Sequence, residues 1–560
     1  MKFPDMPYTR PEFDEMNTKL GELLAKFKAA QTSEEAFAVY KEIDDFNAKM
    51  YTQFSIARIR NTIDTTDEFY DAEKQYANET LPKLQPASQA LTMALLESPF
   101  RKDFEAAWGT LMFDNAEMRL KTFKPEIVED LQEENKLASE YDKLIASAQI
   151  EFDGKTLTLS QFGPYFENPD REVRKAAMLA SANWRLEQGA KLDEIFDKLV
   201  KLRTKIAKKL GYDSFTQLGY YRMQRNCYDE AMVEKFREGV VKYIVPVVTR
   251  LKEAQAKRIG VEALTVYDDP FEYPEGNAKP FGTPDEIFAH GKKMYHELSA
   301  ETGEFMDFML ENELFDCLSK PGKQAGGYCA YIADYKSPFI FANFNGTSGD
   351  IDVLTHEAGH AYAGYKARDI YPSALRNYSN ETAEVHSMAM EFFTWPWMEG
   401  FFGKETKKYY FSHLASALIF IPYGTMVDEF QHHIYAKPEM TPAQRNELWL
   451  ELEKKYRPYL DLNDGFPYFS EGRRWQSQLH IYRIPFYYID YCLAQIIALS
   501  FWAESQSDKQ ASWEKYVKFV GYAGTKTFLD LVTGADLPSP FIPENLKIVA
   551  DAAVAWLDEQ

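Results

Sequence analysis

The chain of 560 residues carries a formal net charge of −22, and charged residues make up 27% of it. A polyanionic surface repels phosphate backbones and anionic lipid surfaces, so these values argue against a nucleic-acid or membrane partner. The sequence contains no uninterrupted apolar run close to the roughly 20 residues of a membrane span. Four scattered cysteines and a start without a signal-peptide pattern predict free thiols and a cytoplasmic location.

The first 150 residues predict successive amphipathic helices. Apolar residues recur at helical spacing over residues 16–27, and Thr32 followed by Glu35 is typical of a capping box at the start of the next helix. The pattern then changes, because Asp153-Gly154 lies between two short β-favouring runs. This dipeptide predicts a small hairpin.

Helical patterns resume over residues 171–262, with a turn expected at Leu210-Gly211. The stretch 266–284 is rich in proline and glycine, which favours an irregular surface connection. A strand is expected at residues 338–344, and helical patterns continue from there to the C-terminus. The sequence therefore predicts a mostly α fold with small β elements near the middle of the chain.

The stretch VLTHEAGHAY contains two of the nine histidines, His356 and His360. At positions i and i+4 of a helix, two imidazoles lie on one face and can bind one metal ion. Glu357 follows the first histidine, where its carboxylate can reach an activated water without binding the metal. This H-E-x-x-H pattern is the signature of zinc hydrolases. Ser348 and Asp350 are both candidates for the N-cap of the helix.

A third metal ligand is expected, because catalytic zinc usually has three protein ligands and a water. The helix NETAEVHSMAMEFFTW carries Glu381, Glu384 and Glu391, of which the last two lie two turns apart on one face. Carboxylates on an otherwise apolar helix are costly to bury without partners. A metal at that face would account for them, whereas the alternative is a solvated acidic stripe. We predict a site of two histidines and one glutamate.

Other polar residues of this region have predicted supporting roles. Glu391 and Glu381 are candidate acceptors for the ring N–H groups of the ligand histidines. His386 lies about 200° round the helix from the predicted ligand glutamate, so it is expected to be structural. His432 and His433 are adjacent on a helix and cannot both face one site, which favours two surface histidines.

HEAGH, followed 24 residues after its second histidine by a glutamate in ETAEVHSMAMEF, resembles the M3 metallopeptidases, specifically the oligoendopeptidase F-like ones. Three further blocks resemble that family in the same order: GKQAGGYCAYI, SPFIFANFNGT and HIYRIPFYYIDY. The resemblance covers residues 171–541. It implies two helical lobes that enclose a deep substrate channel, with small β elements beside the active-site helix. The expected division is an N-terminal helical region at 1–165 and a catalytic region at 166–550.

The resemblance also implies roles for the residues of the motif. His356, His360 and Glu384 would bind one Zn²⁺ ion, although other divalent ions suit such a ligand set. Glu357 would take a proton from the attacking water and pass it to the leaving amine.

The downstream block HIYRIPFYYIDY is implied to stabilise the oxyanion of the tetrahedral intermediate, through His480, Tyr488 and Tyr491. On a helix Tyr491 shares a face with both Tyr487 and Tyr488, so the spacing does not choose between them, and the resemblance favours Tyr488. The alternative for this block is an aromatic core stripe. The strand Phe339–Phe344 is expected to hydrogen-bond an extended peptide by strand addition.

The expected function is zinc-dependent hydrolysis of internal peptide bonds in short unstructured peptides. A dipeptidyl carboxypeptidase is the alternative within enzymes, and it requires a fixed cation for the C-terminal carboxylate, for which Arg473, Arg474 and Arg483 are candidates. A non-catalytic helical peptide-binding protein is the alternative outside enzymes. The presence of Glu357 argues against it, because metal binding does not require that carboxylate.

Overall fold

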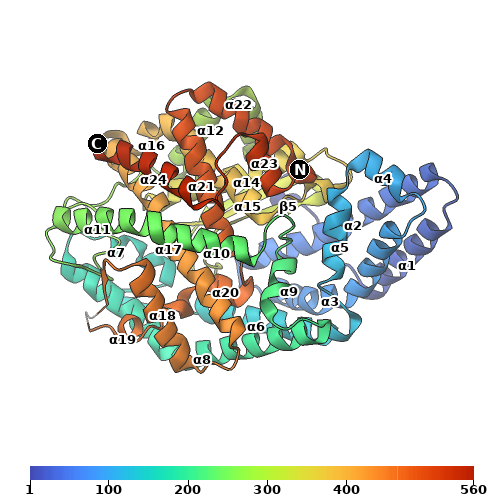
Figure 1. The fold of residues 1–560 in the computed structure, drawn as a ribbon, viewed down its shortest axis with the longest axis horizontal. Coiled ribbons are helices and arrows are strands. Elements are labelled where there is room, and N and C mark those ends of the chain that lie inside the picture. The colour runs from blue at the N-terminus through green and yellow to red at the C-terminus, as the bar shows by residue number, and fades with distance from the viewer. Residues whose placement is uncertain (463–464) are drawn as a thin grey trace.

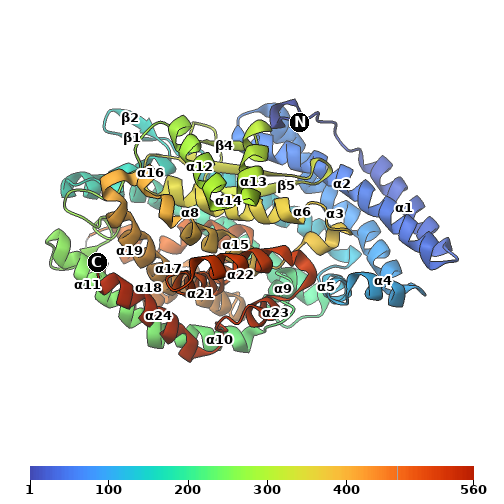
Figure 2. The same cartoon turned by 90° about the horizontal axis from the view of Figure 1, so that it is seen from above.

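The computed structural model describes residues 1–462 and 465–560, and its architecture is mostly helical, as predicted (Figure 1). The first helices lie together at one end of the molecule in both views (Figures 1 and 2). They are α1 (Phe13–Ala29), α2 (Ser33–Ile63), α3 (Glu68–Leu96), α4 (Arg101–Trp108) and α5 (Leu111–Leu120). The four cysteines are free, as expected.

The hairpin predicted in the first half of the chain is confirmed, and the capping box is present in part, because the Glu35 side chain accepts from the backbone N–H of Gln31 instead of that of Thr32. The Thr32 side chain accepts a hydrogen bond from the backbone N–H of Glu35 at 3.2 Å and caps α2. Strands β1 (Ile150–Phe152) and β2 (Lys155–Leu157) form the antiparallel hairpin. Asp153 and Gly154 make its turn with φ of 52° and 68°, the left-handed conformation that such two-residue turns require.

The middle of the chain is mostly helical as well. They are α6 (Val128–Ala146), α7 (Gly163–Phe166), α8 (Arg171–Leu210), α9 (Phe215–Arg222), α10 (Glu230–Gly239), α11 (Val245–Ile259), α12 (Pro284–Leu298) and α13 (Ala300–Glu311). Helix α8 ends at the predicted turn, where Gly211 adopts a φ of 94°.

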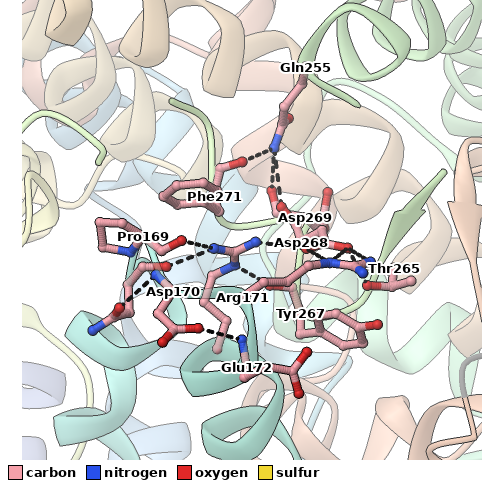
Figure 3. Close-up of polar contacts among 12 residues, drawn as sticks. Pro169, Asp170, Arg171, Glu172, Gln255, Thr265, Tyr267, Asp268, Asp269 and Phe271 are labelled. Carbon is pink, nitrogen blue, oxygen red and sulfur yellow. Dashed lines mark hydrogen bonds and ion pairs between the residues drawn. The ribbon is translucent and has the colours of Figure 1, made fainter. Parts of the chain in front are cut away.

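The predicted connection 266–284 has no regular structure before Pro284, where α12 begins, as expected, but it is not a surface connection throughout. Asp268 is fully buried and accepts hydrogen bonds from Arg171 at 2.7 Å, Arg174 at 2.9 Å and Thr265 at 2.8 Å (Figure 3). Burial alone would raise the pKa of Asp268, but the two guanidinium groups outweigh it and lower the pKa. This stretch is therefore held against the start of α8 by a buried ion cluster.

A three-stranded sheet of order β4–β6–β5 lies beside the catalytic helix, built from β4 (Phe315–Leu318), β5 (Tyr328–Ile332) and β6 (Ser337–Phe344). Strand β6 pairs with β4 in parallel and with β5 antiparallel. Both of its edges are occupied, so the expectation that Phe339–Phe344 would pair with a peptide is wrong. In the described part of the chain, the edge strand beside the candidate site is β5. A separate short pair joins β3 (Leu264–Thr265) to β7 (Leu460–Asp461).

The second half of the chain is a helical body whose core lies around α15 and α21. Its elements are α14 (Gly349–Ala367), α15 (Asn380–Phe393), α16 (Glu399–Phe402), α17 (Thr406–Ala436), α18 (Pro442–Tyr456), α19 (Pro467–Ser470), α20 (Leu479–Arg483), α21 (Tyr488–Ser505), α22 (Lys509–Gly521), α23 (Phe528–Gly534) and α24 (Pro543–Asp558). Figure 2 shows α14 beside α15, with α22 and α21 close by.

One helical stretch, Glu399–Ala436, is apolar and long enough to be a candidate membrane span by composition. This is a longer apolar stretch than the sequence patterns suggested. Of its most apolar window, 61% is buried inside the protein, which is the environment of a core helix.

Candidate active site

The three predicted metal ligands converge between α14 and α15. Oε2 of Glu384 lies 3.2 Å from Nε2 of His356 and 3.3 Å from Nε2 of His360. One ligand atom from each of the three residues lies within 4.8 Å of the others. Two imidazole nitrogens and one carboxylate oxygen at this spacing form a donor set that suits a single divalent ion.

A glycine lets the two helices approach closely enough for this arrangement. A Cβ atom at Gly359 would lie 2.5 Å from the carbonyl oxygen of His386 and 2.6 Å from Cα of Ser387. These neighbours are backbone atoms, which cannot move aside as a flexible side chain could. The glycine of HEAGH therefore fixes the separation of α14 and α15, and with it the distance from the histidines to Glu384.

The carboxylate of Glu384 is buried among donors. Burial alone would raise its pKa, but His360 and His356 outweigh burial and lower it. The Ser387 hydroxyl donates to its Oε2 at 3.1 Å, and the Tyr487 hydroxyl donates to its Oε1. The carboxylate is thus held ionised and oriented toward the histidines.

Glu391 supports the first histidine, as predicted. Its Oε1 accepts from Nδ1 of His356 at 2.7 Å, and its Oε2 accepts from Nε2 of His413 at 2.9 Å. Nδ1 of His413 in turn accepts from the Trp395 indole N–H at 3.1 Å. The sequence analysis missed His413, because it lies on α17 and no local pattern connects it to the motif.

Glu381 does not have the predicted supporting role. It is buried, and its carboxylate accepts a 3.4 Å hydrogen bond from the Tyr228 hydroxyl. In the described part of the chain no hydrogen bond joins it to a ligand histidine. The first turn of α15 directs it away from α14, toward Asp490 on α21, and burial followed by that neighbouring charge raises its pKa to about 7.

Glu357 is the carboxylate of the site that is not among the three converging ligands. It is 6% exposed, and its Oε2 has no hydrogen-bond partner among the described residues. Burial raises the pKa of this carboxyl. A Cβ at Gly327 would lie 3.3 Å from its Oε1, so a glycine leaves room beside the carboxylate. A buried carboxylate oxygen without a hydrogen-bond partner among the described residues, next to three converging ligands, fits a site that holds a metal ion and a water.

The ligands and Glu357 face a cavity of about 390 Å³. Its floor is formed by α14 and α15 and one wall by Gly327–Tyr331, which include most of the edge strand β5. A second cavity of about 450 Å³ lies on the other side of His356 and Tyr491, which line both. The candidate site therefore lies between two neighbouring cavities that share His356 and Tyr491 in their linings.

The structure places the residues of the downstream block around these two cavities. Tyr487 and Tyr491 line the cavity that holds the ligands, whereas Tyr488 and His480 line the second cavity together with Tyr491. The His480 ring lies 4.9 Å from that of Tyr488 and 5.8 Å from that of Tyr491, centroid to centroid. Burial, followed by the charge of Arg483, lowers the pKa of His480 to about 4, which leaves the imidazole neutral.

Three further histidines can now be placed. His386 is buried between Tyr378 and Phe519, outside the ligand group, which confirms its structural role. His433 is exposed, as expected, but the prediction for His432 is wrong.

The ring of His432 is only 9% exposed, because it packs between α9 and α10. Its Nδ1 lies 3.1 Å from Glu230 Oε1, and its Nε2 lies 3.2 Å from the Tyr220 hydroxyl.

The arginines considered for carboxylate binding have other partners. Arg473 pairs with Glu471 at 2.9 Å, and Arg483 pairs with Asp142 at 3.5 Å. Arg474 lies 5.0 Å from the centroid of the Tyr423 ring.

A helical body that holds two histidines and a glutamate beside a buried carboxylate is typical of a class, the metal-dependent hydrolases. Family models give the particular family. The model described as Peptidase family M3 matches residues 165–536, and that of the Peptidase M3 N-terminal domain matches residues 3–123. The chain belongs to peptidase family M3.

Individual relatives agree with this assignment. The solved structure of PZ peptidase A with inhibitor 2 is 47% identical, covers 100% of this chain and 99% of its own, and superposes with a TM-score of 0.98. An oligoendopeptidase F homolog of Borreliella burgdorferi is 24% identical over 498 residues, which is 83% of this chain and 79% of the relative. The oligoendopeptidase-F of Enterococcus faecium, at 17% identity and a TM-score of 0.63 over 98% of both chains, shares the fold.

Proposed function

We propose that this M3 peptidase is a zinc-dependent endopeptidase that hydrolyses internal bonds of short unstructured peptides. His356, His360 and Glu384 would hold one Zn²⁺ ion. When bound, such an ion acidifies water and polarises a carbonyl oxygen. The observation that carries the proposal is the position of Glu357, a buried carboxylate with a free oxygen beside three converging ligands.

Glu357 supplies the proton transfer in this proposal. Its carboxylate takes a proton from the attacking water and delivers it to the leaving amine. Both transfers need an oxygen that is not held by the protein, and Oε2 meets this condition among the described residues. Burial excludes bulk water, which would otherwise compete for the same proton.

Tyr491, Tyr488 and His480 are the proposed donors to the oxyanion. Tyr491 is the one of the three that lines the cavity of the ligands as well as the adjoining one. Tyr487 lines the ligand cavity too, but its hydroxyl is already donated to Glu384. This contact favours an orienting role for Tyr487 and leaves the oxyanion to its neighbours.

The cavities beside the metal ligands support a short, extended substrate. The ligands lie between cavities of about 390 and 450 Å³, which an extended peptide chain could occupy on either side of them. The free edge of β5 along one wall offers backbone groups for pairing with such a chain. Arg473 and Arg483 already pair with Glu471 and Asp142, so they give no support to the dipeptidyl carboxypeptidase alternative, which needs a cation for the C-terminal carboxylate.

The test is mass spectrometry of an end-blocked peptide of about ten residues after incubation with the zinc-loaded protein. Glu357→Gln is treated in parallel, and the zinc content of both proteins is measured. Internal cleavage by the wild type alone, at equal zinc content, is the expected result. Release of dipeptides from a free-ended peptide, without cleavage of the blocked one, would favour the carboxypeptidase. No cleavage of either would leave the non-catalytic peptide-binding protein.

A further inference from the structure

A third cavity, of about 480 Å³, adjoins the one that holds the metal ligands. It lies between the N-terminal helices and η6 (Ser373–Arg376). The two cavities share Tyr331, Arg376 and Asn377 in their linings. A peptide that extends out of the ligand cavity on this side would therefore enter the space lined by α2, α3 and α5.

Two arginines line this third cavity, and neither forms an ion pair with a carboxylate among the described residues, although Arg376 lies near enough to Asp369 to lower the pKa of that carboxyl. Arg119, on α5, has no ion pair and no hydrogen bond from its guanidinium among the described residues, and Arg376 donates its Nε to the Ile370 carbonyl at 2.8 Å. The chain has 86 acidic residues against 64 basic ones, so carboxylates are abundant. Arginines elsewhere, such as Arg174 and Arg203, are paired with them.

No carboxylate among the described residues balances the positive charge of the Arg119 guanidinium. Burial lowers the pKa of its guanidinium, while Tyr40 and Tyr51 nearby act to raise it. Asp44 lines the same cavity, but its carboxylate accepts from the backbone N–H of Ser373 at 2.9 Å and from the Ser373 hydroxyl, so it is used to cap η6. A half-buried cation without a partner costs folding free energy, which a ligand anion would offset.

We propose that the cavity lined by Arg119 and Arg376 is a subsite for a carboxylate of the peptide substrate. This rests on the proposed peptidase function and names a substrate class for it: peptides that place an anionic group in this cavity while another bond lies at the metal ligands. Guanidinium and carboxylate groups match in charge and in planar geometry. The carboxylate comes either from the C-terminus or from an aspartate or glutamate side chain.

The test compares matched fluorogenic peptides. One pair differs only in a C-terminal carboxylate or amide, and a second series of amides replaces one glutamine at a time by glutamate. For the wild type we expect kcat/KM to be about tenfold or more higher for at least one carboxylate peptide than for its neutral match. Arg119→Gln should bring this ratio close to one. Arg250→Gln, which removes an exposed arginine of α11, should leave the ratio unchanged.

Thermal unfolding separates a binding role from a structural one. Loss of a structural arginine would lower Tm, whereas Arg119→Gln should keep Tm or raise it, because no ion pair is broken. Preference for the C-terminal carboxylate identifies the terminus as the ligand, and preference for one glutamate position identifies a side chain. A wild-type ratio of one for all pairs would overturn the subsite.

A binding measurement keeps this test independent of catalysis. Fluorescence anisotropy of labelled peptides with Glu357→Gln gives the ratio of Kd values for the same pairs. Carboxylate preference in binding without turnover in the wild type would support the subsite and refute the peptidase. Turnover of the neutral peptides, with no carboxylate preference in either measurement, would support the peptidase and refute the subsite.

Discussion

Glu391 Oε1 accepts a hydrogen bond from Nδ1 of His356 at 2.7 Å, while Nε2 of the same ring faces Glu384. This contact fixes which ring nitrogen is free to bind a metal ion. A second contact, from His413 Nε2 at 2.9 Å, holds the Glu391 carboxylate in place. Glu391 and His413 thus orient the ligand His356 without being metal ligands themselves.

Replacing Glu391 by Gln should lower zinc affinity about 10- to 100-fold, because the acceptor that orients His356 is weakened. The measurement is competition with a chelator of known affinity. Glu429→Gln is the control, since this carboxylate pairs with Lys455 at 2.7 Å rather than with a residue of the ligand group. Equal zinc affinity of wild type and Glu391→Gln would refute this role.

Gly359→Ala should force α14 and α15 apart, because the added Cβ would lie 2.5 Å from a backbone oxygen. Overpacking of this kind typically costs about 1–3 kcal/mol of unfolding free energy. Urea denaturation measures it, and zinc affinity should fall in parallel. Gly21→Ala is the matched control, since a Cβ there has open space and should leave stability equal or higher. An unchanged midpoint for Gly359→Ala would contradict the role of the close approach.

Tyr491→Phe should lower kcat by roughly 10²–10³ with little change in KM, if its hydroxyl donates to the oxyanion. Steady-state kinetics on one peptide with Tyr488→Phe and Tyr487→Phe alongside would distinguish the three. For Tyr487→Phe we expect weaker zinc binding, because its hydroxyl donates to Glu384. A larger loss of kcat in Tyr488→Phe than in Tyr491→Phe would return the main role to Tyr488, as the family resemblance favoured.

Glu167 should make the protein less stable as pH rises. Burial, followed by repulsion from Glu272, raises its pKa from 4.5 to about 7. Below pH 4 the carboxyl is protonated in both the folded and unfolded states, so it has no effect. As pH rises from about 4.5 to 7 the unfolded chain loses its proton first, and the folded state becomes less favourable. Glu167→Gln should therefore raise the free energy of unfolding at pH 8 by at most about 3 kcal/mol, and it should not do so at pH 4. Thermal unfolding at the two pH values measures this as a higher Tm at pH 8 only. The same gain at both values would point to packing instead.

The parts of the site that local spacing specifies were predictable. The i, i+4 histidines, the glutamate between them and the two-turn spacing from Glu384 to Glu391 all follow from the geometry of single helices. The sequence could not show that β6 lies in the centre of its sheet, because β4 joins it from an earlier, separate part of the chain. Nor could it show the burial of His432, whose partner Glu230 is about 200 residues away. The cytoplasmic location and the division at residue 165 stay predictions.

The free edge of β5 also sets a length scale. The strand has five residues, each of which advances the chain by about 3.3 Å, so the edge is roughly 16 Å long. A paired peptide can form backbone hydrogen bonds only along this distance, and residues beyond it add none. The contribution of backbone pairing to peptide affinity should therefore increase up to a length of about five residues and then level off.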